Sequence, residues 1–527
     1  MSKIIVRNSC IMIKDYNLGD CKELEKNFMV FDPTYHKFNI LGMYYSAQTS
    51  TLYIPRGVDI WKIKQYLHEK DHIVDNPDKF EETGNIRIKY KPRDSEQEEA
   101  LKFMIGIDPY RENLYLPQLS VNLNTGKGKT YCSIATIAFI RIKSIIITGS
   151  TTLLTQWKEN IKEYTDLTDK DIMFLSGSPI MNMILHNKST QAKNAKIFLC
   201  THATIRSFCD TYGWSKLSEV FQILGIGMKF FDEAHTNFDN MLMIDFFTNC
   251  YKTYYVTATP GRSDYRENKI YQLSIKNVPD INLFNVDKDP HTDYIAIKYN
   301  SRPTPTDIKF CYNYKYGLNR IKYISYLMRN DNFWMIMRIV MDMYLKCKGR
   351  GLFYIGTNEG VVKVYQWICT NYPQMINQIG IYTSLVPHDQ KIQMKEKQLL
   401  LSTTKSAGLG EHIEGLKMTV VVAEPFKSEI LTRQTLGRTR DKDTLYIELV
   451  DLGFKYTRNY YYAKLPVLNK YALSVSDTTI DQYELNQRAQ KLIDQQEKKN
   501  DMCPIYFLDN GKLEERLNSI KKEDMDK

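Results

Sequence analysis

Residues 121–134 read VNLNTGKGKTYCSI, between an apolar run, LYLPQLSVNL, and an apolar segment, YCSIATIAFI. Phosphate binding by a loop requires small residues, so that backbone N–H groups can converge, and a helix N-terminus behind them. Gly126 and Gly128 meet the steric requirement. The stretch therefore predicts a strand, a phosphate-binding loop and a helix, in that order. The alternative is a basic turn.

Four further residues complete this predicted nucleotide site. Lys129 is expected to reach the β- and γ-phosphates, and the Thr130 hydroxyl is expected to bind Mg²⁺. Thr125 and Lys127 lie in the same loop. Leu123 stands where the G-x-x-x-x-G-K-[ST] pattern has its first glycine, which is a departure from that pattern.

About a hundred residues later, KFFDEAHTNF places two adjacent acids after an apolar strand. Asp232 is expected to hold the metal, and Glu233 to orient or deprotonate an attacking water. The alternative is a strand that ends in two surface acids. The nearby TATPGR (257–262) supplies Thr257 and Thr259, which are candidates for coupling the nucleotide to a neighbouring lobe.

Short β-branched runs alternate with helical segments from about residue 90 onward. SIIITG (144–149), KIFLCT (196–201) and KTYYVTAT (252–259) belong to a first series, and GLFYIGT, IGIYTS and MTVVVAEP belong to a second. Apolar strands between helices predict parallel sheets that are covered on both faces. The fold class is therefore α/β with two lobes.

RQTLGRTRD (433–441) offers cations in the second lobe. Phosphoryl transfer gains most from a cation at the γ-phosphate. Arg438 and Arg440 are candidates for that cation, and Gln434 is a candidate for holding the water. The alternative is a basic helix face.

DEAH, TATP and Q-x-x-G-R-x-R, in this order across residues 90–455, resemble the motifs of superfamily 2 helicases and translocases. Within that superfamily the chain is most similar to helicases of phages and large DNA viruses, of the phage UvsW type and the poxvirus transcript-release type. The resemblance implies two tandem RecA-like lobes, ATP and Mg²⁺ as cofactors, and Arg438 as the safer arginine finger. Gln97 resembles the glutamine that reads adenine, and His235 belongs to the coupling motif.

The resemblance also implies residues that hold a nucleic-acid backbone without reading bases. The alternative for each threonine among them is ordinary capping at a strand end. These residues are Thr151, Gln156, Thr201, His202, Thr357 and Thr403.

The composition, 43% hydrophobic and 25% charged, predicts a soluble globular protein, expected in the cytoplasm and without a membrane segment. Ten scattered cysteines without a C-x-x-C pair argue against a zinc site and a disulfide framework. The net charge of +10 weakly favours an anionic partner. Richness in Lys, Ile, Tyr and Asn fits an AT-rich phage or viral genome.

Four domains are expected from these patterns. Residues 1–90 predict a small α/β accessory domain that recognises the nucleic-acid substrate, with Lys62, Lys64 and Arg56 as possible phosphate contacts or as a solvated basic face. Residues 91–285 and 286–455 predict the two lobes, and residues 456–527 a helical, charged extension. The tyrosines 460–462 are expected to pack half-buried rather than to stack on bases.

The leading functional hypothesis is an ATP-dependent DNA helicase or translocase that acts on branched or forked DNA in recombination, repair or replication restart. An RNA-directed or transcript-release helicase is the alternative within the class. A packaging ATPase, or an ATP-gated nucleic-acid-binding module without unwinding, is the alternative from another class. Protein partners are not readable from the sequence.

Overall fold

The computed structural model describes residues 2–32, 37–106, 116–123, 127–186, 189–234, 237–257, 265–275, 277–282, 292–313, 317–347, 349–407, 413–436 and 443–500. The chain divides into two compact units, residues 1–285 (unit 1) and residues 286–527 (unit 2). Each unit contains one seven-stranded sheet in which all the neighbouring strands are parallel. The expected class of two tandem parallel-sheet lobes is confirmed.

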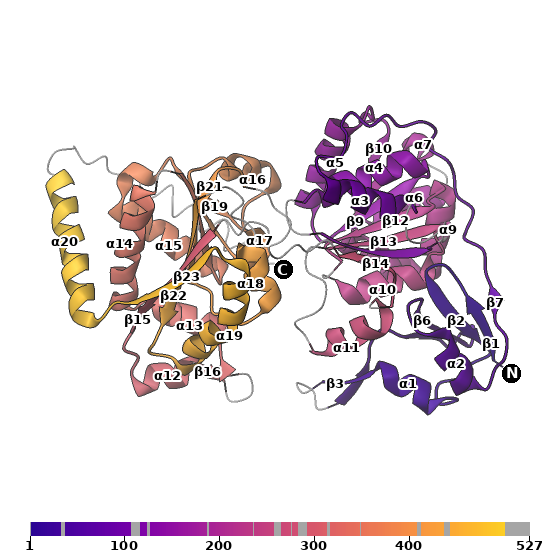
Figure 1. Cartoon of the computed structure of the whole chain (residues 1–527), viewed down its shortest axis with the longest axis horizontal. Coiled ribbons are helices and arrows are strands. Elements are labelled where there is room, and N and C mark those ends of the chain that lie inside the picture. Colours follow the sequence, from indigo (N-terminus) through magenta and orange to yellow (C-terminus); the bar gives the residue numbers. More distant parts are fainter. Residues whose placement is uncertain are drawn as a thin grey trace. The chain divides into compact units, whose positions relative to one another are not determined.

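The sheet of unit 1 has the order β10-β11-β9-β12-β13-β8-β14 (Figure 1). Its strands are β8 (Gln118–Asn122), β9 (Ser144–Thr148), β10 (Ile172–Phe174), β11 (Ile197–Thr201), β12 (Met228–Asp232), β13 (Lys252–Thr257) and β14 (Asp280–Asn282). Its helices are α3 (Ser95–Ile105), α4 (Lys129–Ile140), α5 (Thr151–Tyr164), α6 (Ser178–Leu185), α7 (Thr190–Asn194), α8 (His202–Tyr212), α9 (Ser215–Leu224), α10 (Phe238–Phe247) and α11 (Tyr265–Ser274).

Side-chain alternation explains why both faces of this sheet are buried. In β9, Ile146 packs with α3, α4 and α5, whereas Ile145 and Ile147 pack with the helices of the opposite face. Successive side chains of a strand point to opposite faces, so a run of isoleucines supplies two cores at once.

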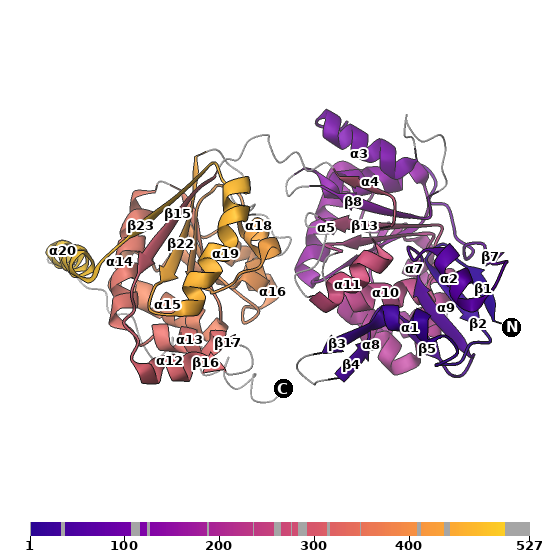
Figure 2. The same cartoon turned by 60° about the horizontal axis from the view of Figure 1, so that its bottom comes forward.

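The N-terminal part of unit 1 forms a second, mixed sheet of order β5-β6-β2-β1-β7, a hairpin of β3 and β4, and two helices. Its elements are β1 (Lys3–Val6), β2 (Cys10–Lys14), α1 (Lys22–Phe28), β3 (Met29–Asp32), β4 (Lys37–Ile40), β5 (Tyr44–Ser46), β6 (Thr51–Pro55), α2 (Ile60–Leu67) and β7 (Ile73–Val74). These elements lie beside α10 and α11 in two views (Figures 1 and 2).

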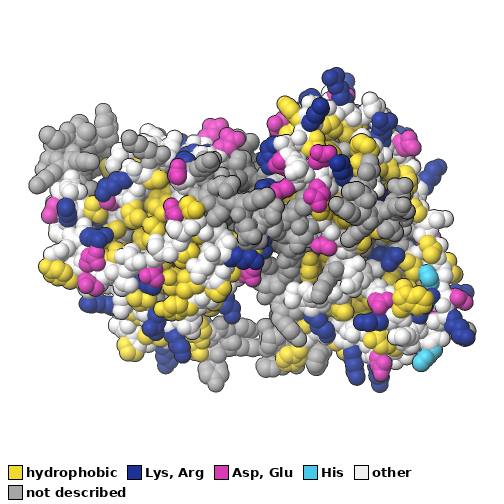
Figure 3. Space-filling view, viewed as in Figure 1, with side chains coloured by type: hydrophobic (Ala, Val, Ile, Leu, Met, Phe, Trp, Pro, Cys, Tyr) yellow, Lys and Arg dark blue, Asp and Glu magenta, His cyan; other side chains and the backbone are white. Residues whose placement is uncertain are grey.

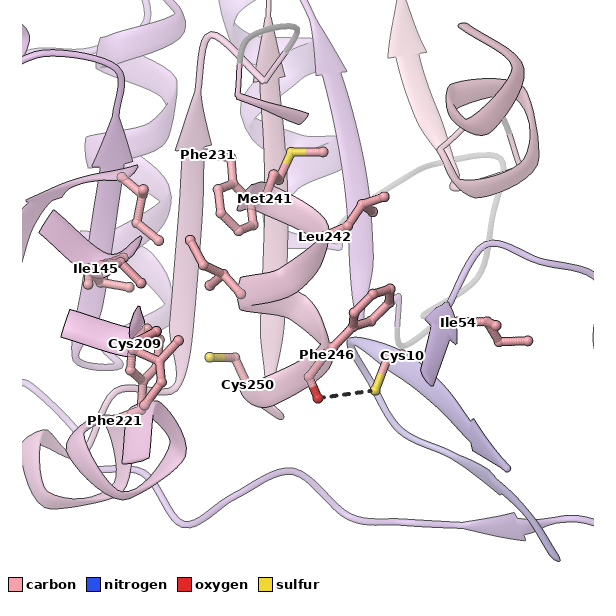
Figure 4. Packing of buried hydrophobic residues seen from close by; sticks show 14 of the residues in the cluster. Cys10, Ile54, Ile145, Cys209, Phe221, Phe231, Met241, Leu242, Phe246 and Cys250 are labelled. Carbon is pink, nitrogen blue, oxygen red and sulfur yellow. Dashed lines mark hydrogen bonds between the residues drawn. The ribbon is translucent and has the colours of Figure 1, made fainter. Parts of the chain in front are cut away.

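One hydrophobic core joins the N-terminal sheet to the lobe behind it. Cys10 and Ile54 pack in the same cluster as Phe231 and Phe246, and the Cys10 thiol donates to the Phe246 carbonyl oxygen at 3.7 Å (Figure 4). Gly57 allows close approach, because a Cβ there would lie 1.8 Å from the Ser274 carbonyl oxygen. Residues 1–90 are thus packed firmly against the first lobe.

The sheet of unit 2 has the order β19-β20-β18-β21-β22-β15-β23, and a short hairpin of β16 and β17 stands apart from it. Its strands are β15 (Thr292–Tyr299), β16 (Tyr312–Asn313), β17 (Gly317–Leu318), β18 (Arg350–Ile355), β19 (Ile379–Tyr382), β20 (Leu399–Ser402), β21 (Leu416–Ala423), β22 (Thr444–Asp451) and β23 (Ser474–Thr479). Its helices are α12 (Pro305–Cys311), α13 (Arg320–Leu327), α14 (Asp331–Lys346), α15 (Asn358–Asn371), η1 (Pro373–Met375), α16 (His388–Lys395), α17 (Thr404–Ala407), α18 (Glu429–Leu436), α19 (Lys455–Tyr471) and α20 (Gln482–Asn500).

The C-terminal region is helical over α19 and α20, but it also contributes a strand. β23 pairs with β15 in parallel from Asp293 opposite Ser474 to Lys298 opposite Thr479. The domain boundaries stay predictions, although this pairing shows that residues 474–479 continue the second sheet. Within the described residues, no helix is long and apolar enough to cross a lipid bilayer, and every cysteine is a free thiol.

Candidate nucleotide-binding site

The predicted phosphate loop joins β8 to α4, as the sequence indicates. Thr125 and Gly126 lie outside the described residues, whereas Lys127 and Gly128 are described. Gly128 is the N-cap of α4 with a φ of +86°, and no side chain caps this helix. A Cβ at Gly128 would lie 2.2 Å from the Gln97 Nε2 atom, so only glycine fits there. The first N–H groups of α4 thus follow a backbone that suits anion binding.

Gln97, the expected adenine reader, lies directly against this loop. Its side chain is 5% exposed. The Oε1 atom accepts from the backbone N–H of Arg93 at 2.9 Å, and Nε2 donates to the Lys127 carbonyl oxygen at 3.4 Å. Gln97 therefore connects the segment before α3 to the phosphate loop, and its contact with adenine stays a prediction.

Lys129 and Thr130 occupy the first turn of α4. The Lys129 ammonium donates to the Leu123 carbonyl oxygen at 3.3 Å, across the loop. Both side chains are half-buried. A lysine held at the start of a helix, above a glycine turn, is placed for a phosphate ligand.

Asp232 ends β12 and is held by two donors. The Trp157 indole N–H donates to Oδ2 at 2.8 Å, and the Glu233 backbone N–H donates to Oδ1 at 3.0 Å. Burial raises the pKa of Asp232 to about 6, and the charge of Glu233 adds to that, while Trp157 and Lys129 oppose it. A carboxylate whose charged form is under-compensated favours a bound cation.

The backbone at Glu233 is unusual for a residue with a side chain. Its φ is +52°, in the left-handed region. Such a conformation costs on the order of 1–3 kcal/mol and is concentrated at functional sites. This backbone conformation turns the chain sharply after β12. The side chains of Asp232 and Glu233 therefore leave the backbone in different directions.

The predicted residues of unit 1 share one edge of the sheet. The strands are parallel, so the loop after β8, Thr151 after β9, Thr201 at the end of β11 and Asp232 at the end of β12 lie at the carboxyl edge. Thr257 ends β13, and its carbonyl oxygen accepts from the Leu123 N–H at 3.1 Å. Ligands of open α/β sheets bind at this edge. His235 and Thr259 lie outside the described residues.

Three of the predicted backbone-contacting threonines are helix caps or turn caps. Thr201 accepts from the Thr204 N–H at 3.1 Å, Thr357 from the Gly360 N–H at 3.0 Å, and Thr403 from the Ser406 N–H at 3.2 Å. The hydroxyls of Thr201 and Thr403 also donate to Thr204 Oγ1 and Ser406 Oγ, each at 3.0 Å, so a phosphate oxygen would have to replace those acceptors. The nucleic-acid role of these residues stays a prediction.

The other predicted contacts differ in exposure. Thr151 is exposed at the start of α5, and Gln156 is half-buried in the same helix. His202 is only 2% exposed, and its ring stacks on Phe231 with centroids 5.9 Å apart. Burial lowers the pKa of His202 to about 4, so the ring is neutral near pH 7. In this conformation His202 packs against the end of β12.

In unit 2, Gln434 is buried in α18, and Arg438 and Arg440 lie outside the described residues. Their roles stay predictions. Glu424, which the sequence analysis missed, follows β21 and forms an ion pair with Arg320 at 2.5 Å.

Trp157 was also missed by the sequence analysis. It lies on the apolar side of α5, where a buried indole needs an acceptor for its N–H group. The need of a buried indole N–H group for an acceptor was the feature of the sequence that could have identified Trp157.

Comparisons with known proteins bear on the fold and on the resemblance to a family. Residues 89–262 match the family model "Type III restriction enzyme, res subunit". No curated protein sequence matches the chain.

Three solved structures resemble the chain to different degrees, and the first two show the likeness in fold. A variant of S. cerevisiae Dbp5 bound to RNA and ADP BeF3 is 14% identical with a TM-score of 0.50, covering 75% of this chain and 93% of Dbp5. A fragment described as an HsdR subunit of a type I restriction enzyme from Vibrio vulnificus is 12% identical with a TM-score of 0.50, covering 90% and 85%. T4 UvsW is 13% identical with a TM-score of 0.34, covering 91% and 99%. The expected resemblance to superfamily 2 helicases is confirmed.

Proposed function

We propose that the chain, which resembles superfamily 2 helicases, is an ATP-hydrolysing motor that translocates on DNA and remodels branched or forked DNA. The observation that carries the proposal is the carboxyl edge of the first sheet. Lys129, Asp232 and Glu233 meet there with the predicted nucleic-acid residues Thr151 and Thr201. One edge thus serves both hydrolysis and strand binding.

In the proposed chemistry, Lys129 and the N–H groups of α4 bind the phosphates of ATP. Thr130 and Asp232 hold Mg²⁺, which supplies charge neutralisation on the phosphates. The raised pKa of Asp232 supports this role, since a cation would favour its ionised form. Glu233 orients the attacking water and accepts its proton.

Two features support the binding of a nucleic acid. The N-terminal sheet packs on α10 and the β3–β4 hairpin packs on α11, so DNA bound by residues 1–90 would be held on the lobe that carries the proposed hydrolytic residues. The net charge of +10 favours an anionic polymer. We propose a role in recombination, repair or replication restart of a phage or virus, in the host cytoplasm.

The second candidate is a helicase directed to RNA. The Dbp5 structure that shares the fold is bound to RNA. Backbone-holding motifs do not by themselves distinguish the two polymers.

Variants of the hydrolytic edge test the site. Lys129→Ala should abolish ATP turnover, because it removes the phosphate cation. Glu233→Gln should bind a fluorescent ATP analogue as the unmodified protein does, yet hydrolyse ATP at least 100-fold more slowly, since general bases contribute roughly 10²–10⁴-fold. Retained turnover in Lys129→Ala would contradict the assignment.

Strand-displacement assays on a DNA fork, a four-way DNA junction and an RNA duplex of matched length, at one salt concentration, test the substrate. Displacement of branched DNA alone supports the proposal. Displacement of RNA alone would favour the second candidate.

A further inference from the structure

A surface of unit 2 outside the predicted motifs combines exposed aromatic rings with cations. It consists of Lys309, Phe310, Tyr312, Ile321, Lys322 and Arg329, on α12, β16 and α13 and just beyond α13, and we call it the α12–α13 surface. Phe310, Tyr312 and Ile321 are 40%, 43% and 66% exposed. Basic and hydrophobic side chains lie next to one another over these helices (Figure 3).

The cations of this surface are placed around the exposed ring. The Lys322 ammonium lies 5.2 Å from the centroid of the Phe310 ring, and the Arg329 guanidinium lies 5.7 Å from it. Such cation–π contacts hold the charges at the aromatic group.

Other exposed cations of unit 2 form ion pairs, whereas the cations of this surface, within the described residues, do not. Exposed Lys346, Lys363 and Arg488 each pair with an acid one helical turn away. Within the described residues, Lys309, Lys322 and Arg329 form no ion pair with a carboxylate. The neighbouring acid, Asp307, is used by Thr304 in a capping box whose hydrogen bonds lower its pKa, and Arg329 adds to that effect. The surface is therefore positive.

Buried polar groups fix the backbone beneath this surface. Asp451 accepts from the Ser301 N–H at 3.0 Å and from the Tyr323 hydroxyl at 3.4 Å, and the Tyr326 hydroxyl donates to the Ser301 carbonyl oxygen at 3.1 Å. On the outer side, the Tyr312 ring contacts Tyr456 with centroids 5.9 Å apart. The exposed rings are thus presented by a rigid support, which lowers the entropic cost of binding.

The surface also lies at the carboxyl edge of the second sheet. β15, β18 and β22 are parallel, and they lead into α12, α15 and α19 respectively. α12 packs beside α13 (Figure 2), and a Cβ at Gly360 of α15 would lie 3.0 Å from Ile324 Cγ2 of α13. Thr357, which is predicted to contact the nucleic-acid backbone, is the N-cap of α15 at this same edge.

We infer that the α12–α13 surface binds the unpaired bases of a single nucleic-acid strand. Phe310 and Tyr312 stack on bases, and Lys309, Lys322 and Arg329 contact the adjacent phosphates. Exposed rings combined with a positive surface are the features that bind single strands with little sequence preference. The inference deepens the proposed motor function, on which it rests, because it adds a base-contacting site to a backbone-gripping core.

The test is fluorescence anisotropy with a labelled oligothymidylate, without nucleotide and over a series of salt concentrations. Phe310→Ala with Tyr312→Ala should weaken binding by roughly 5- to 100-fold, and Phe310→Trp should retain it. Lys322→Gln with Arg329→Gln should reduce the slope of log affinity against log salt by about 0.7 per contact. The matched control is Tyr483→Ala with Lys491→Gln on α20, an exposed ring and an exposed lysine.

A second readout separates stacking from a structural effect. An oligonucleotide that contains 2-aminopurine should lose fluorescence on binding to the unmodified protein, but not on binding to the aromatic double variant at saturation. Basal ATP turnover without nucleic acid should be the same in all these variants.

The failures can be told apart. If a strand stimulates ATP turnover and the aromatic double variant binds it like the α20 control, the α12–α13 surface is not the base-binding site, whereas the motor function stands. A protein that occupies this surface instead would give that same result. If the unmodified protein neither binds the strand nor responds to it, the proposed function itself fails.

Discussion

At the scale of single residues, His202 shows how a predicted ligand can have a structural role. The resemblance predicts His202 as a nucleic-acid contact, but its ring is buried and stacked on Phe231. Within the described residues, neither ring nitrogen has a hydrogen-bond partner. A buried imidazole without a partner is tolerated only while it is neutral.

His202 should therefore make unit 1 sensitive to acid. Its folded-state pKa of about 4 lies below the ordinary value of 6.5, so its stabilising effect is complete above about pH 6.5 and is lost as the pH falls toward 4. The loss should reach roughly 3 kcal/mol. His202→Phe should remove this part of the pH dependence, measured as Tm between pH 4 and 7. His72→Phe, at an exposed histidine, is the control. Equal slopes in both variants would contradict the account.

At the scale of elements, β12 carries a buried ion pair at the end opposite to Asp232. Lys229 and Asp245 of α10 are fully buried, with Nζ and Oδ1 2.5 Å apart. Tyr255 donates to Asp245 at 2.5 Å, and Gln118 links Tyr255 to the Ser9 carbonyl oxygen through bonds of 2.8 and 3.0 Å. Burial raises the pKa of Asp245 despite these partners. The network joins the N-terminal sheet to β12, the strand that ends in the proposed hydrolytic acids.

Removing one charge of this pair should cost more than removing both. Lys229→Met leaves Asp245 buried without its cation and should lower the free energy of unfolding by about 3–5 kcal/mol. Lys229→Met with Asp245→Asn should recover a large part of that loss, since the amide can still accept from Tyr255. Urea unfolding of the two single variants and the double variant measures the difference. Additive losses would show that the two side chains do not interact energetically.

Strands with apolar character could be predicted from the sequence, whereas the polar strand β23 could not. The run SIIITG predicted β9, because β-branched residues between turns favour a buried strand. The segment SVSDTT of β23 has no such pattern, since it is an edge strand that stays largely exposed. Its pairing with β15 depends on backbone hydrogen bonds, which leave no signal in side-chain hydropathy.

The candidate site was predictable for a similar reason. GKGKT and DEAH are residue patterns typical of phosphate and metal binding. Because parallel strands share a carboxyl edge, the sequence also predicts that the two motifs lie close together. The Trp157 bond to Asp232 and the packing of Gln97 on Gly128 could not be predicted, because both join segments far apart in the sequence. Such contacts depend on tertiary packing rather than on local pattern.

At the scale of the whole molecule, two parallel sheets each present a carboxyl edge with predicted nucleic-acid contacts. The first edge also carries the proposed hydrolytic residues, and the second carries the α12–α13 surface. A motor requires that strand binding and ATP hydrolysis be linked, and linkage is reciprocal for binding free energies. Nucleic acid should therefore change how the chain uses ATP.

The most direct test of the account is steady-state ATP hydrolysis with no nucleic acid, with single-stranded DNA, with a four-way DNA junction and with single-stranded RNA, at one salt concentration. Glu233→Gln serves as the control for contaminating ATPases. The account predicts slow basal turnover that nucleic acid raises at least 10-fold, most strongly with junction DNA, and none of this in Glu233→Gln. Turnover that is indifferent to every nucleic acid would contradict the motor function and leave only a nucleotide-hydrolysing site at the edge of the first sheet.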